Sequence, residues 1–222
     1  MATADSLWGV LLAFDTASPQ VTVALLDDAG SVVAERRSED LMKHAEQLAP
    51  LIAGVLADAG AEQFDVTALA VGVGPGPFTG LRVGLATART LAMVREIPVY
   101  GVCSLDALAV EAVGTGAVTG PFLVATDARR KEVYWASYDE TGRRTSEPAV
   151  DRPADVASEL PVVGEGARLY PEQFPNAVEP LRPSAGWLGH AVVSELAELL
   201  DPDPLYLRRP DAVAPGKPKA VS

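Results

Sequence analysis

The sequence contains few of the residues that build disulfide frameworks and metal clusters. Among its 222 residues there is one cysteine, Cys103, and there are two histidines, His44 and His190. A single cysteine excludes an intramolecular disulfide and every multi-cysteine metal cluster, and two histidines leave little material for a zinc site within this chain. No His-Glu-x-x-His or His-x-x-x-His pair is present, so the sequence disfavours a self-contained metallopeptidase.

Basic residues and long apolar runs are also scarce. The chain has 18 lysines and arginines against 30 aspartates and glutamates, a formal net charge of −12. A domain that binds tRNA or DNA unaided needs a basic surface, because phosphate contacts dominate such affinity. The first apolar run, residues 8–14, is too short to span a bilayer and lacks the basic flank of a signal peptide. We expect a cytoplasmic protein without membrane contact.

The first half of the chain alternates strand-like and helix-like segments. Short apolar runs are separated by turn residues, and longer segments have helical periodicity. Ser38 is placed to cap the first helix, Gly60 to end it and Ser104 to cap the third helix. The pattern predicts strands at 8–14, 20–26, 31–36, 68–73 and 99–102, and helices at 39–59, 81–95 and 105–113.

The segment 114–120, rich in glycine and threonine, is the best candidate for a boundary between two lobes. Strands open the second half as well, and after a proline-rich stretch the pattern predicts a strand at 162–163 and a helix at 186–200. We therefore expect one lobe over 1–113, a smaller lobe over 114–200, and a proline-rich tail over 201–222 whose end is partly disordered.

An internal similarity connects the two halves. Residues 14–30 align without a gap over residues 126–142, so that Asp15 matches Asp127 and Gly30 matches Gly142. Hairpins resemble one another by chance, but a repeat at a fixed offset also indicates repeated architecture. The second interpretation predicts an α/β protein with the actin-like (ASKHA, ribonuclease H-like) two-lobed fold, built from duplicated mixed-sheet lobes.

The turns after the first strand of each lobe carry no glycine. In actin-like kinases this turn holds nucleotide phosphate through free backbone N–H groups, which glycine allows to approach the anion. Here the first turn contains Pro19, which has no N–H to donate. Both turns are therefore unsuited to a triphosphate, and Asp15 either braces its turn or binds a metal through water.

The most distinctive segment runs from Gly74 to Arg82. It reads as a rigid strand-to-helix turn in which Thr79 caps the following helix. It is not a phosphate-binding P-loop, because Leu81 and Arg82 stand where that loop needs Lys and Ser or Thr. Arg82 and Arg89 share a helix face and either pair with acidic groups of this or another chain or are solvated. The residues of this signature loop are Gly74, Pro75, Gly76, Phe78, Thr79, Gly80 and Arg82.

The helices at 39–59 and 81–95 are broadly apolar. The second has one apolar face around Leu85 and another, on the opposite side, around Met93. A helix that is apolar on two sides is buried either in a thick core or between its own sheet and a partner chain. The candidate partner-contact residues on the two helices are Leu41, Ala45, Leu48, Ile52, Leu81, Leu85, Ala88 and Met93.

The sequence Gly-Pro-Gly-Pro-Phe-Thr-Gly-Leu-Arg at 74–82 resembles the signature of the TsaB family, bacterial tRNA threonylcarbamoyladenosine biosynthesis proteins. Further segments agree in order and spacing, and the match runs from about residue 8 to residue 208. These segments are 15–18, 44–48, 104–105, 127–129 with 132–134, and 204–208. Pro77 replaces the usual serine, so a role for that hydroxyl is in doubt here.

The resemblance implies an actin-like fold whose own nucleotide and metal sites have decayed, and a non-catalytic dimerisation subunit. Family members pair through the two helices of the N-terminal lobe with the catalytic subunit TsaD, or with a second copy of themselves. TsaD transfers a threonylcarbamoyl group to the adenosine beside the anticodon in tRNAs that read codons starting with A, and an ATPase, TsaE, joins the assembly. The resemblance also implies no cofactor on this chain alone, ATP or ADP at most at a joint interface, and tRNA contact only through the complex.

Two other functions remain open on the sequence. An actin-like ATPase or small-molecule kinase would use Asp15 and Asp127 with magnesium, and would bind ATP tightly without a partner. A metallopeptidase is the weaker alternative and would carry bound metal.

Overall fold

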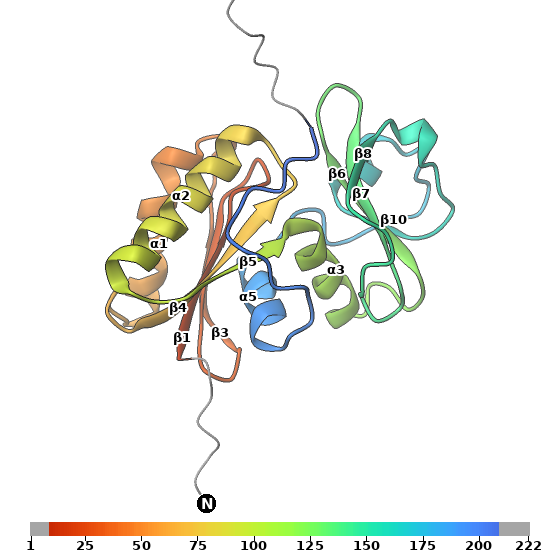
Figure 1. The fold of residues 1–222 in the computed structure, drawn as a ribbon. Coiled ribbons are helices and arrows are strands. Elements are labelled where there is room, and N and C mark those ends of the chain that lie inside the picture. Colours follow the sequence, from red (N-terminus) through yellow and green to blue (C-terminus); the bar gives the residue numbers. More distant parts are fainter. Residues whose placement is uncertain (1–8, 209–222) are drawn as a thin grey trace, which may run out of the picture.

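The computed structural model describes residues 9–208, which form two five-stranded sheets connected by helices (Figure 1). The first sheet has the order β3-β2-β1-β4-β5 and the second the order β10-β9-β6-β7-β8. In each, the strand that opens the lobe pairs antiparallel with the next strand and parallel with the fourth strand of its lobe. The two lobes therefore share one topology, and the actin-like two-lobed fold predicted from the repeat is confirmed.

The first sheet contains β1 (Val10–Asp15), β2 (Thr22–Leu26), β3 (Val32–Arg37), β4 (Val66–Gly74) and β5 (Val99–Cys103). Its central strands are apolar on both faces because helices cover both faces. Alternate residues of β1 face the helices α1 (His44–Ala59) and α2 (Phe78–Arg95) on one side. The residues between them face α5 (Ala185–Val193) on the other side.

The second sheet is smaller. It contains β6 (Phe122–Asp127), β7 (Val133–Tyr138), β8 (Ala149–Asp151), β9 (Val162–Val163) and β10 (Ala177–Val178). The short helix α4 (Glu165–Leu169) covers one face, and α3 (Ser104–Gly114) packs on the other. A single 3-10 turn, η1 (Pro153–Asp155), follows β8.

Two helices pack across the lobe boundary that the sequence suggested. α3 precedes the expected boundary at 114–120 but shares a core with Phe122 and Tyr138 of the second sheet. α5 follows the second sheet in sequence but packs Leu188 and Val192 against the first. The two helices also contact each other, so the lobes are joined by packed helices and not by a simple linker. Within residues 9–208, no helix is long and apolar enough to cross a bilayer.

After α5 the chain continues along the first lobe, and we call residues 200–208 the C-terminal strap. Leu200 exchanges two backbone hydrogen bonds with Gly101 of β5, and the Leu205 N–H donates to the Val73 carbonyl. Arg208 then reaches the second lobe, where it donates to the Ala128 carbonyl and pairs with Glu132. The expected disorder at the end of the tail concerns residues 209–222, which lie outside the described residues.

Several predicted helix ends were wrong for local reasons. α1 begins at His44 and not after Ser38, because the Ser38 backbone and hydroxyl bond to Val21 and extend the hairpin. α2 begins at Phe78, so Thr79 lies inside the helix and does not cap it. The last helix ends at Val193 rather than near 200, shortly before Glu195 adopts a left-handed backbone with φ 51°.

Candidate functional site

Asp15, at the end of β1, lies at the centre of a buried cluster that collects most of the family motifs. One carboxylate oxygen accepts the Ala17 N–H at 2.7 Å and the other accepts the Ser104 hydroxyl at 2.5 Å. Ser104 therefore holds Asp15 and does not cap α3. Complete burial raises the pKa of Asp15, while the hydrogen bonds from Ser104 and Ala17 oppose that rise. Asp15 braces its turn, as one of the two sequence interpretations proposed.

The signature loop packs directly against this turn. A Cβ atom on Gly76 would lie 2.1 Å from the Ala17 carbonyl oxygen, and one on Gly80 would lie 2.3 Å from the Thr16 carbonyl oxygen. The Thr16 hydroxyl donates in return to the Gly80 carbonyl at 2.8 Å. The glycines of the signature loop therefore let the start of α2 sit against the β1–β2 turn at van der Waals distance.

His44 completes the cluster from the start of α1. Its Nε2 atom lies 2.7 Å from the Ser18 carbonyl oxygen, and the side chain is 4% exposed. The motifs at 15–18, 44–48, 74–82 and 104–105 thus form one contiguous network. Its members hold the start of both long helices at the carboxyl end of the central strand β1, which gives these motif residues a structural role.

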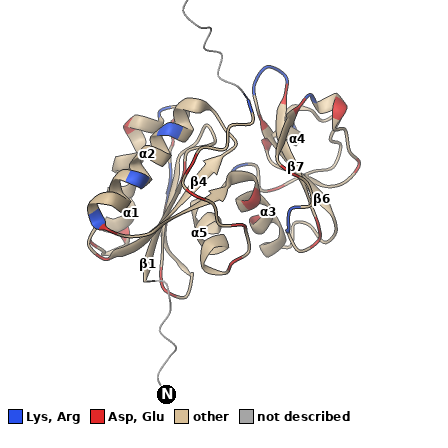
Figure 2. Cartoon of the chain, in the orientation of Figure 1, with Lys and Arg blue, Asp and Glu red and all other residues tan. Residues whose placement is uncertain are grey.

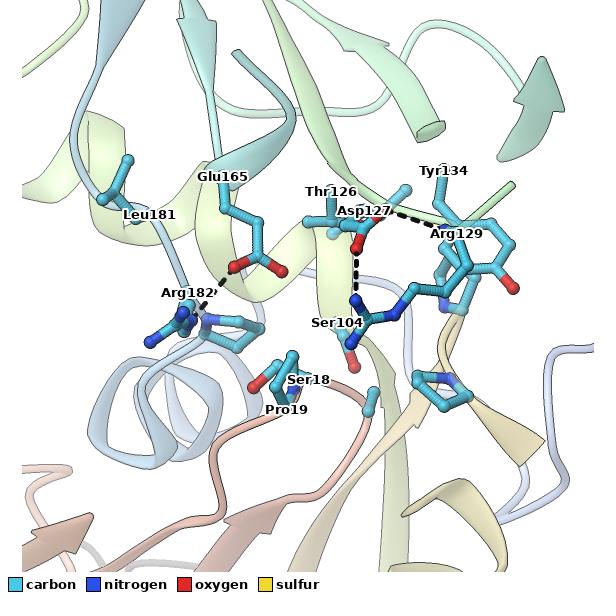
Figure 3. A pocket seen from close by; sticks show the side chains of 15 residues that line it. Ser18, Pro19, Ser104, Thr126, Asp127, Arg129, Tyr134, Glu165, Leu181 and Arg182 are labelled. Atoms are coloured by element: carbon cyan, nitrogen blue, oxygen red, sulfur yellow. Dashed lines mark hydrogen bonds and ion pairs between the residues drawn. The ribbon is translucent and has the colours of Figure 1, made fainter. Parts of the chain in front are cut away.

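The cleft between the lobes is narrow where it faces this cluster (Figure 3). It leaves a cavity of about 20 Å³, room for roughly one water molecule. Prolines supply much of its wall and offer no N–H to an anion; they are Pro19, Pro75, Pro77 and Pro183. The charged side chains on the second-lobe side of the cavity form ion pairs among themselves, Asp127 with Arg129 and Glu165 with Arg182.

Asp15 and Asp127 occupy equivalent positions but do not form one site. Asp127 lines the inter-lobe cavity. Asp15 does not line it, and both of its carboxylate oxygens accept hydrogen bonds from Ala17 and Ser104. A methyl group on Gly72 would lie only 1.8 Å from Asp15 Oδ2, which leaves no space for a ligand on that side. Among residues 9–208, no three His, Cys, Asp or Glu side chains are grouped so that they could hold a metal ion.

Arg82 and Arg89 of α2 both contact the C-terminal strap. Arg82 donates to the Tyr206 hydroxyl at 3.2 Å, and Arg89 donates to the Pro202 carbonyl at 2.8 Å and pairs with Asp203. The ring of Phe78 packs against Tyr206 with 4.7 Å between centroids. Of the alternatives left open by the sequence, pairing with an acidic group of the same chain holds for Arg89, whereas Arg82 contacts a hydroxyl of the same chain.

The structure separates the eight candidate partner-contact residues into two groups. Leu48, Leu81, Leu85 and Ala88 belong to the core between the helices and the first sheet. A partner cannot reach these four without unfolding the lobe, so their assignment to an interface was wrong. Leu41, Ala45 and Met93 are exposed, and Ile52 is half-buried; their role stays a prediction.

The outward side of α1 and α2 carries further apolar residues. An open groove of about 580 Å³ runs between the helices and is lined by Ala49, Ala53, Phe64 and Val94. Met93 is 75% exposed and Val94 69%. The second apolar face of α2 had already indicated Met93, whereas Phe64, in the turn after α1, belongs to no periodic pattern that could have indicated it. We call the exposed apolar set the docking surface: Leu41, Ala45, Ala49, Ala53, Phe64, Ala86, Met93 and Val94.

Comparison with known proteins places this geometry in a family. Residues 31–198 match the sequence family described as "TsaD: tRNA N6-adenosine threonylcarbamoyltransferase". An uncharacterized protein of Mycobacterium tuberculosis is 46% identical over 215 residues, which cover 95% of each chain. The tRNA threonylcarbamoyladenosine biosynthesis protein TsaB of Escherichia coli is 35% identical over 173 residues, covering 73% of this chain and 74% of that protein.

Solved structures agree with the sequence comparison. YeaZ from Pseudomonas aeruginosa superposes with a TM-score of 0.73 at 31% identity, over 90% of this chain and all of that chain. An activator of 2-hydroxyisocaproyl-CoA dehydratase from Clostridium difficile, solved with bound ADPNP, superposes with a TM-score of 0.51 at 11% identity over 84% of this chain and 95% of the other, and shows the fold alone. The chain belongs to the TsaB family of tRNA threonylcarbamoyladenosine biosynthesis proteins.

Proposed function

We propose that the chain acts in tRNA threonylcarbamoyladenosine biosynthesis as a non-catalytic subunit that binds a TsaD-like transferase through its docking surface. The observation that carries this proposal is the pair of long helices. They cover their own sheet with one side and expose a second apolar side across the groove between them. Exposed apolar patches of this kind mark interaction sites in soluble proteins.

The inter-lobe cleft supports the non-catalytic part of the proposal. A triphosphate needs N–H donors and space, and here prolines line a cavity of about 20 Å³. The aspartate that a kinase would use on the first lobe is fully buried and bound to Ser104. These two observations support the proposal that the chain keeps the actin-like frame but binds no nucleotide by itself. ATP or ADP would bind at a joint interface, if a partner supplies the donors.

The proposal includes the wider assembly. A TsaE-like ATPase would join the heterodimer, tRNA would be held by the complex, and the same docking surface would support a homodimer when the transferase is absent. The acidic net charge of −12 suits such a division, because the partner would supply most of the basic surface that RNA requires.

The double variant A45E/M93E tests the docking surface. Both side chains are exposed, so we expect an unchanged fold and a loss of binding of at least tenfold, since the new charges would be desolvated in the interface. The matched control is L169E, a charge placed on an exposed leucine of the second lobe that is 52% exposed. Co-purification with the TsaD-like subunit of the same organism and a titration of the two chains give the readout.

The proposal fails if A45E/M93E binds the transferase as well as the wild type does. It also fails if the isolated chain binds ATP tightly in the presence of magnesium in a calorimetric titration. The second result would favour the ATPase or kinase alternative.

A further inference from the structure

The charged residues of α2 are all cations. Arg82, Arg89 and Arg95 follow one another along the helix, whose sequence contains no aspartate or glutamate (Figure 2). Arg82 and Arg89 are exposed, and they share a side of the helix with Ala86 and Met93 of the docking surface, because positions three, four and seven residues apart lie on one helix face. A partner that covers the docking surface therefore also approaches these two arginines.

The three arginines use their hydrogen-bond donors differently. Arg95 donates both Nη groups to carbonyls of the turn after α1, and Arg89 pairs with Asp203 of the C-terminal strap. Arg82 donates only its Nε–H group, to the neutral hydroxyl of Tyr206 at 3.2 Å. Within residues 9–208, its two Nη groups have no acceptor and its charge has no carboxylate partner. Arg82 is therefore held by the chain without being neutralised by it.

Two aromatic rings restrict the orientation of the Arg82 guanidinium. Its carbon atom lies 5.8 Å from the centre of the Phe78 ring, and that ring packs against Tyr206 with 4.7 Å between centroids. Because the Nε–H group is bound to Tyr206, the free end of the side chain is the pair of Nη groups. Such a planar pair of donors matches the two oxygens of a carboxylate, and a side chain that is already ordered loses less entropy on binding.

Docking would remove water from this guanidinium. Arg82 lies one helical turn before Ala86, so a partner that packs on Ala86 also covers part of Arg82. A charge that loses water is costly unless an opposite charge pairs with it. The strap does not supply that charge, because Tyr206 is neutral and Asp203 already pairs with Arg89. The opposite charge therefore has to come from the partner.

We propose that Arg82 binds a carboxylate of the TsaD-like subunit through its two Nη groups, and that Tyr206 is the positioning residue that orients it. The proposal rests on the proposed function and extends the docking surface from α2 onto the strap. Small apolar residues such as Ala86 provide contact area but little direction. A two-point pair between guanidinium and carboxylate fixes the orientation of the partner and selects for an acidic group.

The test measures the affinity of the chain for its TsaD-like subunit by calorimetric titration at low and high salt. R82Q removes the charge, R82K keeps the charge but loses the planar pair of donors, and Y206F removes only the hydroxyl that orients Arg82. The matched control R89Q makes the same substitution on the same side of α2, at an arginine that Asp203 already neutralises. R143Q removes an exposed charge from the second lobe. Chemical denaturation of each variant checks the fold.

We expect R82Q to weaken binding about tenfold and R82K about threefold. The loss in R82Q should shrink as salt rises from about 50 mM to about 500 mM, because ions screen the lost pair. Y206F should weaken binding about twofold and have no further effect in the R82Q background, since Tyr206 acts through Arg82. R89Q and R143Q should bind within about twofold of the wild type.

An R82Q chain that binds the transferase as the wild type does would overturn this inference, while loss of binding in A45E/M93E would still support the docking proposal. If R82Q kept its affinity for the transferase but weakened tRNA binding by the complex, Arg82 would be a phosphate contact and the inference would again be wrong. An equal effect of Y206F with and without Arg82 would overturn the positioning role of Tyr206. A wild-type chain that forms no complex would overturn both proposals.

Discussion

The turns after β1 and β6 occupy the same place in two lobes of one topology, yet they are built in opposite ways. In the first lobe, Asp15 is buried and both of its oxygens accept hydrogen bonds from within the core. In the second lobe, Asp127 lies at the cleft and pairs with Arg129 at the tip of the β6–β7 hairpin. The two lobes thus keep the same strand order, although the turn after β1 is buried and holds neighbouring elements while the turn after β6 is exposed.

This difference has a cause in what covers each turn. The signature loop and the start of α2 press on the first turn, and their glycines allow contacts at which a Cβ would collide with Thr16 or Ala17. In the second lobe the corresponding loop is followed by the short α4, and its Gly164 and Gly166 approach the Ala125 carbonyl within β6 and not the residues of the turn itself. The two long helices belong to the first lobe. Their first residues contact the β1–β2 turn, and these contacts bury it.

Replacing the two aspartates one at a time should give the largest difference between the two turns. D15A would leave the buried Ser104 hydroxyl and the Ala17 N–H without their acceptor, so we expect the free energy of unfolding to fall by about 2–4 kcal/mol. D127A removes a partly exposed carboxylate and should cost about 1 kcal/mol or less. Chemical denaturation of both variants provides the measurement, and equal losses would contradict the assignment of an anchor to the first turn alone.

An acid at the junction of the lobes gives a smaller, pH-dependent effect. Burial raises the pKa of Glu111 on α3 from 4.5 to about 7, a rise that the nearby Arg37 opposes and Glu35 and Glu179 reinforce. The folded state therefore holds a proton that the unfolded chain releases, and stability falls as the pH rises from about 4.5 to about 7. E111Q should match the wild type near pH 4.5 and melt roughly 1–3 °C higher at pH 8.

Thermal melts of E111Q and the wild type between pH 4.5 and pH 8 check this expectation. The exposed Glu140 offers a control, since E140Q changes the same charge at an exposed turn of the second lobe. A constant difference between E111Q and the wild type across the pH range would show that Glu111 does not titrate differently in the folded state.

The smallest predicted effect concerns the strained tip of the second turn. K131G removes the Cβ from a residue with φ 63° and should raise the free energy of unfolding by about 0.5–1 kcal/mol, the relief of about 1–2 kcal/mol less the entropy that glycine loses on folding. G120A is a useful contrast, because a Cβ there meets no atom within 4 Å. A lower free energy of unfolding for K131G than for the wild type, measured by chemical denaturation, would show that the backbone at residue 131 is not strained.

The fold was predictable from the sequence because the same local pattern of strands and turns occurs in both halves of the chain. The alignment of residues 14–30 with 126–142 places equivalent strands at equivalent positions of the two sheets, and Val21 and Val133 both follow the turn that it predicts. Helix exchange between the lobes was not predictable, since apolar periodicity in α3 and α5 says that each is buried but not against which sheet.

The site was less predictable than the fold. Periodicity cannot tell the side of α1 that meets its own sheet from the side left for a partner, so Leu48 and Ala45 were grouped together although one is buried and the other exposed. Ser38 and Ser104 have the chemistry of helix caps, but their hydroxyls bond to residues far away in sequence, Val21 and Asp15. Contacts of that range are decided by tertiary packing, which overrides local preference.

The C-terminal strap has a mechanical consequence. Two-lobed proteins that close around a ligand do so by turning about a hinge, but here one peptide segment is fastened to β5 and β4 in the first lobe and to Ala128 and Glu132 in the second. Rotation of one lobe against the other would break these fastenings. We therefore expect the strap to restrict changes in the distance between α2 and the β6–β7 hairpin, so that a partner bound to one lobe would keep a nearly fixed position relative to the other.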